Sequence, residues 1–254
     1  MDLQNYLIRF AFNGAAYHGF QVQQNAPTVC AAMQDAMARV FGTRPDVKGV
    51  SRTDAGVHAR DFCLSFFSDT TIPCEKLPLA LNSHLPPDIR VHRALPVPAD
   101  FHARYSALGK EYRYYIHNSP VDDPFTAGFY YRVPHPLDVD AMAEAAAHLE
   151  GCHDFASFKG ESGDIVENTT RTISAISVGR AGDTVVLAVA ADGFLYHMVR
   201  ILAGTVLEAG LGRLVPGEMP GIIAAKNRTP AGPTLPAKGL FLHKVFYPAD
   251  IAGG

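Results

Sequence analysis

The sequence predicts an α+β protein of two related units, each an antiparallel sheet with helices packed on one side. Strand-like segments with alternating apolar residues recur along both halves of the chain. Each half opens with a strand, continues with an Ala-rich helix and then returns to paired strands. Hydrophobic residues make up 48% of the chain and charged residues 19%, which favours a folded core over disorder. We expect one unit at residues 1–105 and the other at 106–254, with a cleft between them.

The elements of the first half follow from local patterns. Residues 6–12 alternate and are rich in β-formers, so they predict a strand. Thr28 is a suitable N-cap for a helix whose apolar residues recur at helical spacing until Gly42. Short strands are expected at residues 47–51, 62–67 and 89–92, with a loop of small and polar residues at 52–60.

The second half is expected to begin with a strand at residues 111–117, where Tyr112, Tyr114 and Ile116 share one face. Residues 120–136 are typical of a loop. Further elements are helices at residues 138–150 and 194–209, a β-hairpin formed by 172–178 and 184–190, and a closing strand at 240–246.

Charge permits a nucleic-acid partner without requiring one. The net charge is −3, whereas RNA-binding proteins usually present a basic face. The charges are unevenly spread, because residues 168–244 hold eight basic and four acidic side chains and residues 89–117 hold five basic and two acidic. Folding could gather these segments into one positive surface, although runs of charge are usually only solvated faces.

The cysteines and histidines predict neither a metal site nor a disulfide. Four cysteines lie far apart without a C-x-x-C pair, and we expect them to be small buried residues: Cys30, Cys63, Cys74 and Cys152. The eleven histidines form no H-x-x-x-H pattern. The N-terminal residues lack the positive and apolar stretches of a secretory signal, and no apolar run is long enough to cross a bilayer, so the expected compartment is the cytoplasm.

Asp54 is the first candidate for chemistry. It lies near Gly56, where backbone can approach a ligand closely, and Arg52 stands two residues before it. An adjacent cation would keep the carboxylate ionised, as a nucleophile or base requires. Taken alone, however, an aspartate in such a loop is more often a turn residue that bonds its own backbone.

The complete loop resembles the catalytic motif of the TruA-type pseudouridine synthases. The core of that motif, Arg-Thr-Asp-Ala-Gly-Val-His, occupies residues 52–58, and seven consecutive matches of mixed chemistry make the resemblance highly specific. Further segments similar to this family follow in the expected order along most of the chain, at residues 12–23, 81–89, 101–107, 110–114, 194–200 and 236–242.

The resemblance implies an isomerase that converts uridine within tRNA to its C-glycoside isomer without a cofactor. It points to uridines 38, 39 and 40 of the anticodon arm. The N-glycosidic bond must break, the uracil must turn, and a carbon must re-bond to the ribose. Asp54 takes the role of the catalytic carboxylate, which would attack the sugar or the base, or stabilise charge as the bond breaks.

The resemblance also assigns functions to three residues of the second half. Arg200 would hold Asp54 oriented and ionised; without the family it is a surface arginine in the middle of a helix. Tyr112 would stack on the target uracil, with its hydroxyl available for proton transfer; without the family it is a cross-strand core aromatic. Leu240 would close the other side of the base, and is otherwise a core residue.

Basic groups in or beside the matched motifs are the candidates for binding RNA phosphates: Arg52, His58, Arg60, Arg104 and Arg113. Each could instead be a solvated surface charge. The family further implies a homodimer in which one tRNA contacts both subunits, and such a dimer would pool two limited basic areas.

Two other functions remain open at the level of sequence. A catalytically silent RNA-binding module would not need Asp54, Tyr112 and Arg200 together. A hydrolase could use Asp54 and His58 as nucleophile and base, but the sequence offers no second carboxylate or organised His–Asp partner nearby.

Overall fold

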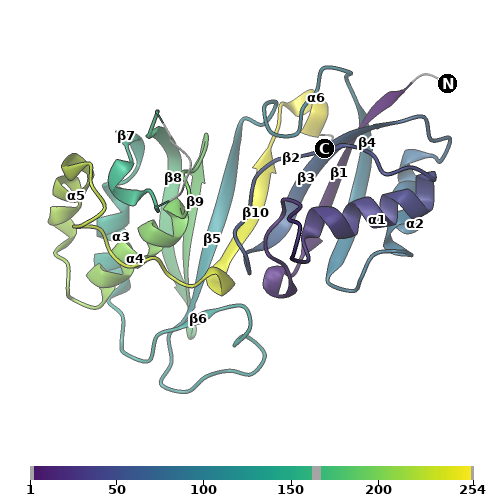
Figure 1. The fold of residues 1–254 in the computed structure, drawn as a ribbon. Helices are drawn as coiled ribbons and strands as arrows, with labels where there is room; N and C mark the ends of the chain where they lie inside the picture. The colour runs from purple at the N-terminus through teal and green to yellow at the C-terminus, as the bar shows by residue number, and fades with distance from the viewer. Residues whose placement is uncertain (1–2, 162–166, 253–254) are drawn as a thin grey trace. The chain divides into compact units, whose positions relative to one another are not determined.

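The computed structural model describes residues 3–161 and 167–252, which separate into two compact units (Figure 1). Unit 1 comprises Met1–Leu108 and Leu242–Gly254, and unit 2 comprises Gly109–Phe241. Each unit combines antiparallel strands with helices, so the predicted α+β class is confirmed. The division expected from the sequence, with one α+β unit at residues 1–105 and the other at 106–254, stays a prediction.

Unit 1 is a sheet with the strand order β4-β1-β3-β10, in which β2 pairs with β3 and β1 is antiparallel to both of its neighbours. Its elements are β1 (Gln4–Phe12), α1 (Val29–Phe41), β2 (Val47–Gly49), β3 (His58–Ser68), α2 (Leu77–Asn82), β4 (Ile89–Val97), α6 (Ala249–Ala252) and residues 242–246 of β10 (Leu240–Phe246), with single 3₁₀ turns at Gly14–Ala16 and Cys74–Lys76.

Helix α1 covers one face of this sheet. The side chain of Thr28 caps its first turn, and Gly42 ends it with a left-handed φ of 74° that glycine adopts without strain. Both ends confirm the sequence prediction. Phe41 stacks on Phe66 of β3 with 5.6 Å between ring centroids, and this contact fixes the helix against the sheet.

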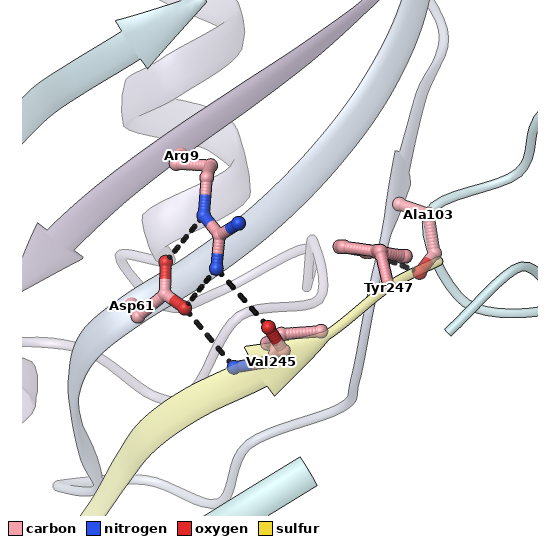
Figure 2. Close-up of polar contacts among 5 residues, drawn as sticks. All are labelled: Arg9, Asp61, Ala103, Val245 and Tyr247. Carbon is pink, nitrogen blue, oxygen red and sulfur yellow. Dashed lines mark hydrogen bonds and ion pairs between the residues drawn. The ribbon is translucent and has the colours of Figure 1, made fainter. Parts of the chain in front are cut away.

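The opposite face of the same sheet carries a partly buried ion pair (Figure 2). Arg9 of β1 donates to Asp61 of β3 through Nε at 2.9 Å and through Nη2 at 2.5 Å. Asp61 also accepts the Val245 N–H at 3.0 Å, while the Val245 carbonyl accepts from Arg9 at 3.1 Å. The hydrogen bond to Asp61 raises the pKa of Arg9 above its ordinary value. The pair therefore fixes strand β10 through both backbone groups of Val245.

Unit 2 is a sheet with the strand order β5-β9-β8-β7, in which neighbouring strands are antiparallel and β6 runs parallel to β5. Its elements are β5 (Gly109–His117), β6 (Tyr131–Arg132), α3 (Val139–Ala147), β7 (Gly151–Asp154), β8 (Thr170–Ala181), β9 (Thr184–Ala191), α4 (Met198–Gly210) and α5 (Met219–Ala225), with 3₁₀ turns at Ala156–Phe158, Pro216–Glu218 and Ala237–Gly239.

Two features of unit 2 follow directly from its sequence. The hairpin of β8 and β9 is confirmed, and Gly182 supplies the positive φ of 57° that its two-residue turn requires. Helices α3 and α4 pack closely, because a Cβ on Gly210 would lie 2.6 Å from the Met142 side chain. Helix α4 is buried along nearly all of its length.

Two predicted helices have different ends in the structure. The helix expected at residues 194–209 begins only at Met198, because His197 adopts a left-handed φ of 59° that the interior of a right-handed helix excludes. The helix expected at residues 138–150 ends at Ala147, and hydrogen bonds between residues three apart tighten the chain just beyond it.

Two strands are longer than the sequence indicated. Strand β3 begins at His58, inside the loop expected at residues 52–60. Strand β4 extends to Val97, beyond the strand expected at residues 89–92. It tolerates Pro96 because it is an edge strand of unit 1, where a missing N–H costs no ladder hydrogen bond.

Two smaller expectations also need correction. The loop expected at residues 120–136 contains the short strand β6. The cysteines were all expected to be buried, but Cys74 is only partly buried and Cys152 is exposed. Cys152 lies on β7, an edge strand of unit 2, where side chains of the outer face meet solvent.

Candidate active site

Asp54 opens a tight turn between β2 and β3. The Val57 N–H donates to the Asp54 carbonyl at 3.2 Å, which closes a β-turn over residues 54–57. Gly56 occupies the third position of this turn with a φ of 78°, where any other residue would be strained. Asp54 is partly exposed at the start of the turn. The local sequence therefore builds a tight turn that leaves Asp54 partly exposed.

Two glycines of residues 13–19 touch the backbone of this turn. A Cβ on Gly14 would lie 1.9 Å from the Val57 carbonyl oxygen, and a Cβ on Gly19 would lie 2.1 Å from the Thr53 carbonyl oxygen. Both distances are far inside van der Waals contact. A side chain at either glycine would therefore displace the loop that carries Asp54.

Hydrogen bonds join the same two segments. The Gly56 N–H donates to the Tyr17 carbonyl at 3.1 Å, and the Gly14 N–H donates to Nδ1 of His58 at 3.0 Å. The Tyr17 hydroxyl in turn donates to Asp88 at 2.8 Å. Burial, followed by the bond to Asp88, raises the pKa of Tyr17 above its ordinary value. The turn that presents Asp54 is thus fixed by backbone contacts from a segment about forty residues earlier in the chain.

The four basic candidates of unit 1 fall into two classes. Arg52, Arg60 and Arg104 are exposed. His58 is only 1% exposed, and its Nδ1 accepts the Gly14 N–H, so a neutral His58 ring carries its proton on Nε2. His58 therefore lies beneath the Asp54 turn, whereas the three arginines lie at the surface.

Tyr112 lies on the buried face of β5. It pairs with Val189 of β9 and is 6% exposed. The ring of Phe194 meets it edge-on, with centroids 5.1 Å apart and planes at 83°. Such an edge-to-face contact fixes the orientation of an aromatic ring. Tyr112 is thus a positioned aromatic group, and its neighbour Phe194 comes from the segment that leads into α4.

Arg113 faces the opposite side of β5. Successive strand residues point to opposite faces, so Arg113 and Tyr112 lie on different sides of the sheet of unit 2. Arg113 donates to Glu111 at 2.7 Å on its own side. The structure therefore does not bring Arg113 and Tyr112 together.

Arg200 lies in the first turn of α4, and the expectation of a mid-helix position is corrected with the later start of the helix. Its Nε donates to the Leu235 carbonyl at 2.7 Å, and the Leu235 N–H donates back to the Arg200 carbonyl at 3.3 Å. This reciprocal pair fixes both the backbone and the guanidinium of Arg200. The left-handed His197 just before the helix determines where that first turn begins.

Residues 235–239 join Arg200 to strand β5. The Tyr114 hydroxyl donates to the Pro236 carbonyl at 2.7 Å, and a Cβ on Gly239 would lie 2.7 Å from the Tyr114 ring. Burial raises the pKa of Tyr114, and the nearby charge of Arg200 opposes this rise. Leu240 follows this segment directly and is buried at 5% exposure. Arg200, Tyr114 and the segment before Leu240 thus form one packed cluster in unit 2.

The predicted site residues are divided between the units. Unit 1 contains Asp54, Arg52, His58, Arg60 and Arg104, and unit 2 contains Tyr112, Arg113, Arg200 and Leu240. Sequence reasoning did not identify the supports, namely Gly14, Gly19, Tyr17 and Leu235. The two glycines stood inside the matched segment at residues 12–23, and that was the signal that could have identified them.

Neither a metal-binding cluster nor a membrane-spanning helix occurs in the described parts of the chain. Among residues 3–161 and 167–252, the side chains of His, Cys, Asp and Glu form no group of three that could hold a metal ion. In the same part of the chain, every helix is too short or too polar to cross a membrane.

Comparison with known proteins gives one consistent family. A family model described as tRNA pseudouridine synthase matches residues 9–106 and 145–248. A protein named tRNA pseudouridine synthase A from Moorella thermoacetica is 48% identical over 242 residues, covering 94% of this chain and 98% of that protein. A protein of the same name from Thermoanaerobacter sp. (strain X514) is 42% identical over 245 residues, covering 96% of this chain and all of that protein.

Similarity to solved structures is much weaker. A chain in the structure of an H/ACA RNP bound to a substrate RNA containing 2'-deoxyuridine is 10% identical, with a TM-score of 0.33, and the match covers 82% of this chain and 53% of that one. The sequence relatives, and not this distant structure, show the family.

Proposed function

The chain belongs to the tRNA pseudouridine synthase family, and we propose that it modifies uridines 38, 39 and 40 of the anticodon arm with Asp54 as its catalytic carboxylate. It is an isomerase that acts on tRNA. The observation that carries the assignment of Asp54 is the turn at residues 54–57, where Gly14 and Gly19 touch the loop backbone and Asp54 is partly exposed.

The reaction needs no redox partner and no net transfer of atoms. The bond between N1 of uracil and C1′ of ribose breaks, the base turns, and a bond forms between C5 and C1′. C5 loses a proton and N1 gains one, so atoms and electrons balance within the substrate. A carboxylate serves this chemistry by adding to the sugar or the base, or by stabilising positive charge on the ribose as the bond breaks.

Tyr112, Arg200 and Leu240 complete the proposed catalytic set. The edge-on contact with Phe194 supports a stacking role for Tyr112, because a flipped base needs a platform of fixed orientation. The reciprocal bonds with Leu235 support a role in which Arg200 holds its charge in one place to orient and ionise Asp54. Leu240 would supply apolar contact to the base.

The exposed arginines are the proposed phosphate contacts. Arg52 and Arg60 flank the Asp54 turn in sequence, and Arg104 lies on a separate surface loop of unit 1. For His58 we propose support of the Asp54 turn instead, because it is buried and bonded to Gly14. Arg113 would contact RNA only on the face of β5 opposite to Tyr112.

We further propose that the protein acts as a homodimer in the cytoplasm. The low net charge of −3 supports the dimer, because two subunits would pool their basic areas on one tRNA. The substrate supports the compartment, since tRNA is modified where it is made and used. Sedimentation of the purified chain, alone and with tRNA, tests the dimer.

The test uses unmodified tRNA with uridines at 38, 39 and 40, purified protein and no added cofactor, followed by mapping of pseudouridine at each position. The native chain should form pseudouridine at these positions, and Asp54→Ala should form none. Asp35→Ala is the matched control: this exposed aspartate pairs only loosely with Arg44, at 3.4 Å, and its loss should leave the rate unchanged.

Other outcomes would indicate a different target or a different function. Pseudouridine only outside positions 38–40 would overturn the proposed target uridines. A folded chain that binds tRNA without forming product would favour the silent RNA-binding module. Free uracil or a cleaved strand would favour the hydrolase.

A further inference from the structure

Tyr105 is an unusually exposed aromatic residue of unit 1. It is 76% exposed, although it follows the buried residue Ala103 by only two positions. The ring of His102 lies 4.4 Å from the Tyr105 ring centroid at an angle of 39°, and the guanidinium carbon of Arg104 lies 5.8 Å from the same centroid. Neither neighbour encloses the ring. A single exposed apolar side chain is common on a folded surface, so a contact with a partner is argued from the neighbours of Tyr105.

The loop that presents Tyr105 is held closed by its own hydrogen bonds. The Ser106 N–H donates to the His102 carbonyl at 2.9 Å, and the His102 N–H donates to Oγ of Ser106 at 3.1 Å. The Arg104 N–H donates to Nδ1 of His102 at 3.1 Å. Residues 102–106 thus form one compact turn, which limits the conformational entropy that Tyr105 would lose on binding.

The turn is also anchored to the core of unit 1. The Ala103 N–H donates to Oγ of Ser65 on β3 at 3.1 Å, and the Ala103 carbonyl accepts from the Tyr247 hydroxyl at 2.6 Å (Figure 2). Ala103 is fully buried. Because both backbone groups of Ala103 are fixed, the two residues that follow it are displayed at a defined place on the surface.

The chemistry of this loop favours RNA over a protein partner. Residues 101–108 of unit 1 contain Arg104 and His102 and no acidic side chain, in a chain of net charge −3. An exposed ring beside an arginine is the usual means of binding unpaired nucleotides, since the ring stacks on a base and the cation meets the backbone phosphate. Phe125 offers a contrast within the same chain: it is 88% exposed but follows two acidic residues, Asp122 and Asp123.

We propose that Tyr105 is a stacking contact for an unpaired base of the bound tRNA, with Arg104 taking the adjacent phosphate. The inference rests on the proposed function for the identity of the RNA and adds a residue outside the set assigned to catalysis. Tyr105 contributes to binding and not to the chemical step.

The experiment measures tRNA affinity as a function of salt, together with kcat and KM for pseudouridine formation, in the full-length protein. Tyr105→Ala should weaken tRNA binding by about tenfold, with an unchanged salt dependence and an unchanged kcat. Tyr105→Phe should retain native affinity, because the ring is kept. Arg104→Ala should reduce the salt slope by about one. Phe125→Ala is the matched control for an exposed aromatic and should bind as the native chain does.

The outcomes separate this inference from the proposed function. A native chain that forms no pseudouridine at positions 38–40 contradicts the proposed function, whatever Tyr105 does. Native affinity in Tyr105→Ala, or an equal loss in Phe125→Ala, overturns the stacking contact alone. A changed assembly mass with native tRNA affinity in Tyr105→Ala would show that Tyr105 contacts a second subunit. This result would also overturn the proposed stacking contact.

Discussion

The proposed site residues of unit 1 and those of unit 2 are held by different means. In unit 1, close backbone contacts from Gly14 and Gly19, which admit no side chain, hold the Asp54 turn together with one bond from the Gly14 N–H to the His58 ring. In unit 2, side-chain bonds from the Arg200 guanidinium to Leu235 and from Tyr114 to Pro236 add to the backbone bond between Leu235 and Arg200. Backbone contact cannot adjust to added volume, whereas a side-chain network loses only the bond that is removed. The Asp54 turn should therefore tolerate substitution less well than the Arg200 cluster.

The largest effect is expected from Gly14→Ala. The new Cβ would meet the Val57 carbonyl at 1.9 Å and displace the loop that carries Asp54. A shift of about 1 Å at a catalytic group lowers kcat by roughly a hundredfold, and the overpacking should lower the free energy of unfolding by about 3 kcal/mol. Single-turnover pseudouridine formation and urea unfolding measure the two effects.

Gly128→Ala is the control for that substitution, because nothing lies within 4 Å of its Cβ position. It should change the free energy of unfolding by less than about 0.5 kcal/mol. Equal kcat values in Gly14→Ala and the native chain would contradict this prediction, since the loop would then move without any effect on catalysis.

An intermediate effect, confined to stability, is expected from Asp61→Ala. The substitution leaves Arg9 and the Val245 N–H without their shared carboxylate in a partly buried site. We expect the free energy of unfolding to fall by about 2 kcal/mol, less than for a fully buried pair. Thermal unfolding measures it, and kcat at a temperature where the variant is folded should stay within about threefold of the native value.

Asp61 lies on β3, the strand that follows the Asp54 turn. A large fall in kcat at full folding would show that the pair of Arg9 and Asp61 also positions Asp54. Disrupting the exposed pair of Asp35 and Arg44 by Asp35→Ala gives the reference, with an expected stability loss below about 1 kcal/mol.

The smallest effect is expected from Tyr114→Phe in unit 2. It removes one hydrogen bond to the Pro236 carbonyl and keeps the packing of the ring against Gly239. The free energy of unfolding should fall by about 1 kcal/mol, and kcat should fall only a few-fold because the bonds between Arg200 and Leu235 remain. A fall in kcat as large as that expected for Gly14→Ala would show that the Arg200 cluster tolerates substitution no better than the Asp54 turn.

Local patterns predicted the elements whose ends depend on their own residues. Thr28 and Gly42 mark the ends of α1 because caps act within one turn of the helix. The start of α4 was missed because the apolar residues before Met198 keep helical spacing, while His197 is held by a distant residue. A Cβ on Gly160 would lie 2.9 Å from the Cβ of His197. The spacing of apolar residues along the sequence cannot predict such a contact between distant segments.

The candidate site residues also depend on contacts that local sequence patterns do not predict. The motif at residues 52–58 located Asp54, but the contacts of Gly14 and Gly19 join segments far apart in the sequence. Arg113 is a different case, because strand alternation alone places it on the other face from Tyr112. Whether two residues share a site is therefore predicted better by the face of the strand on which they lie than by their distance from a motif in the sequence.

The most direct test of the central claim replaces the carboxylate of Asp54 without changing its shape. Single-turnover formation of pseudouridine at positions 38–40 would be compared between the native chain and Asp54→Asn, with tRNA affinity measured for both. We expect native affinity and no pseudouridine from Asp54→Asn, because the amide fits the turn but can neither add to the substrate nor stabilise positive charge. Pseudouridine formed by Asp54→Asn at the native rate would contradict it.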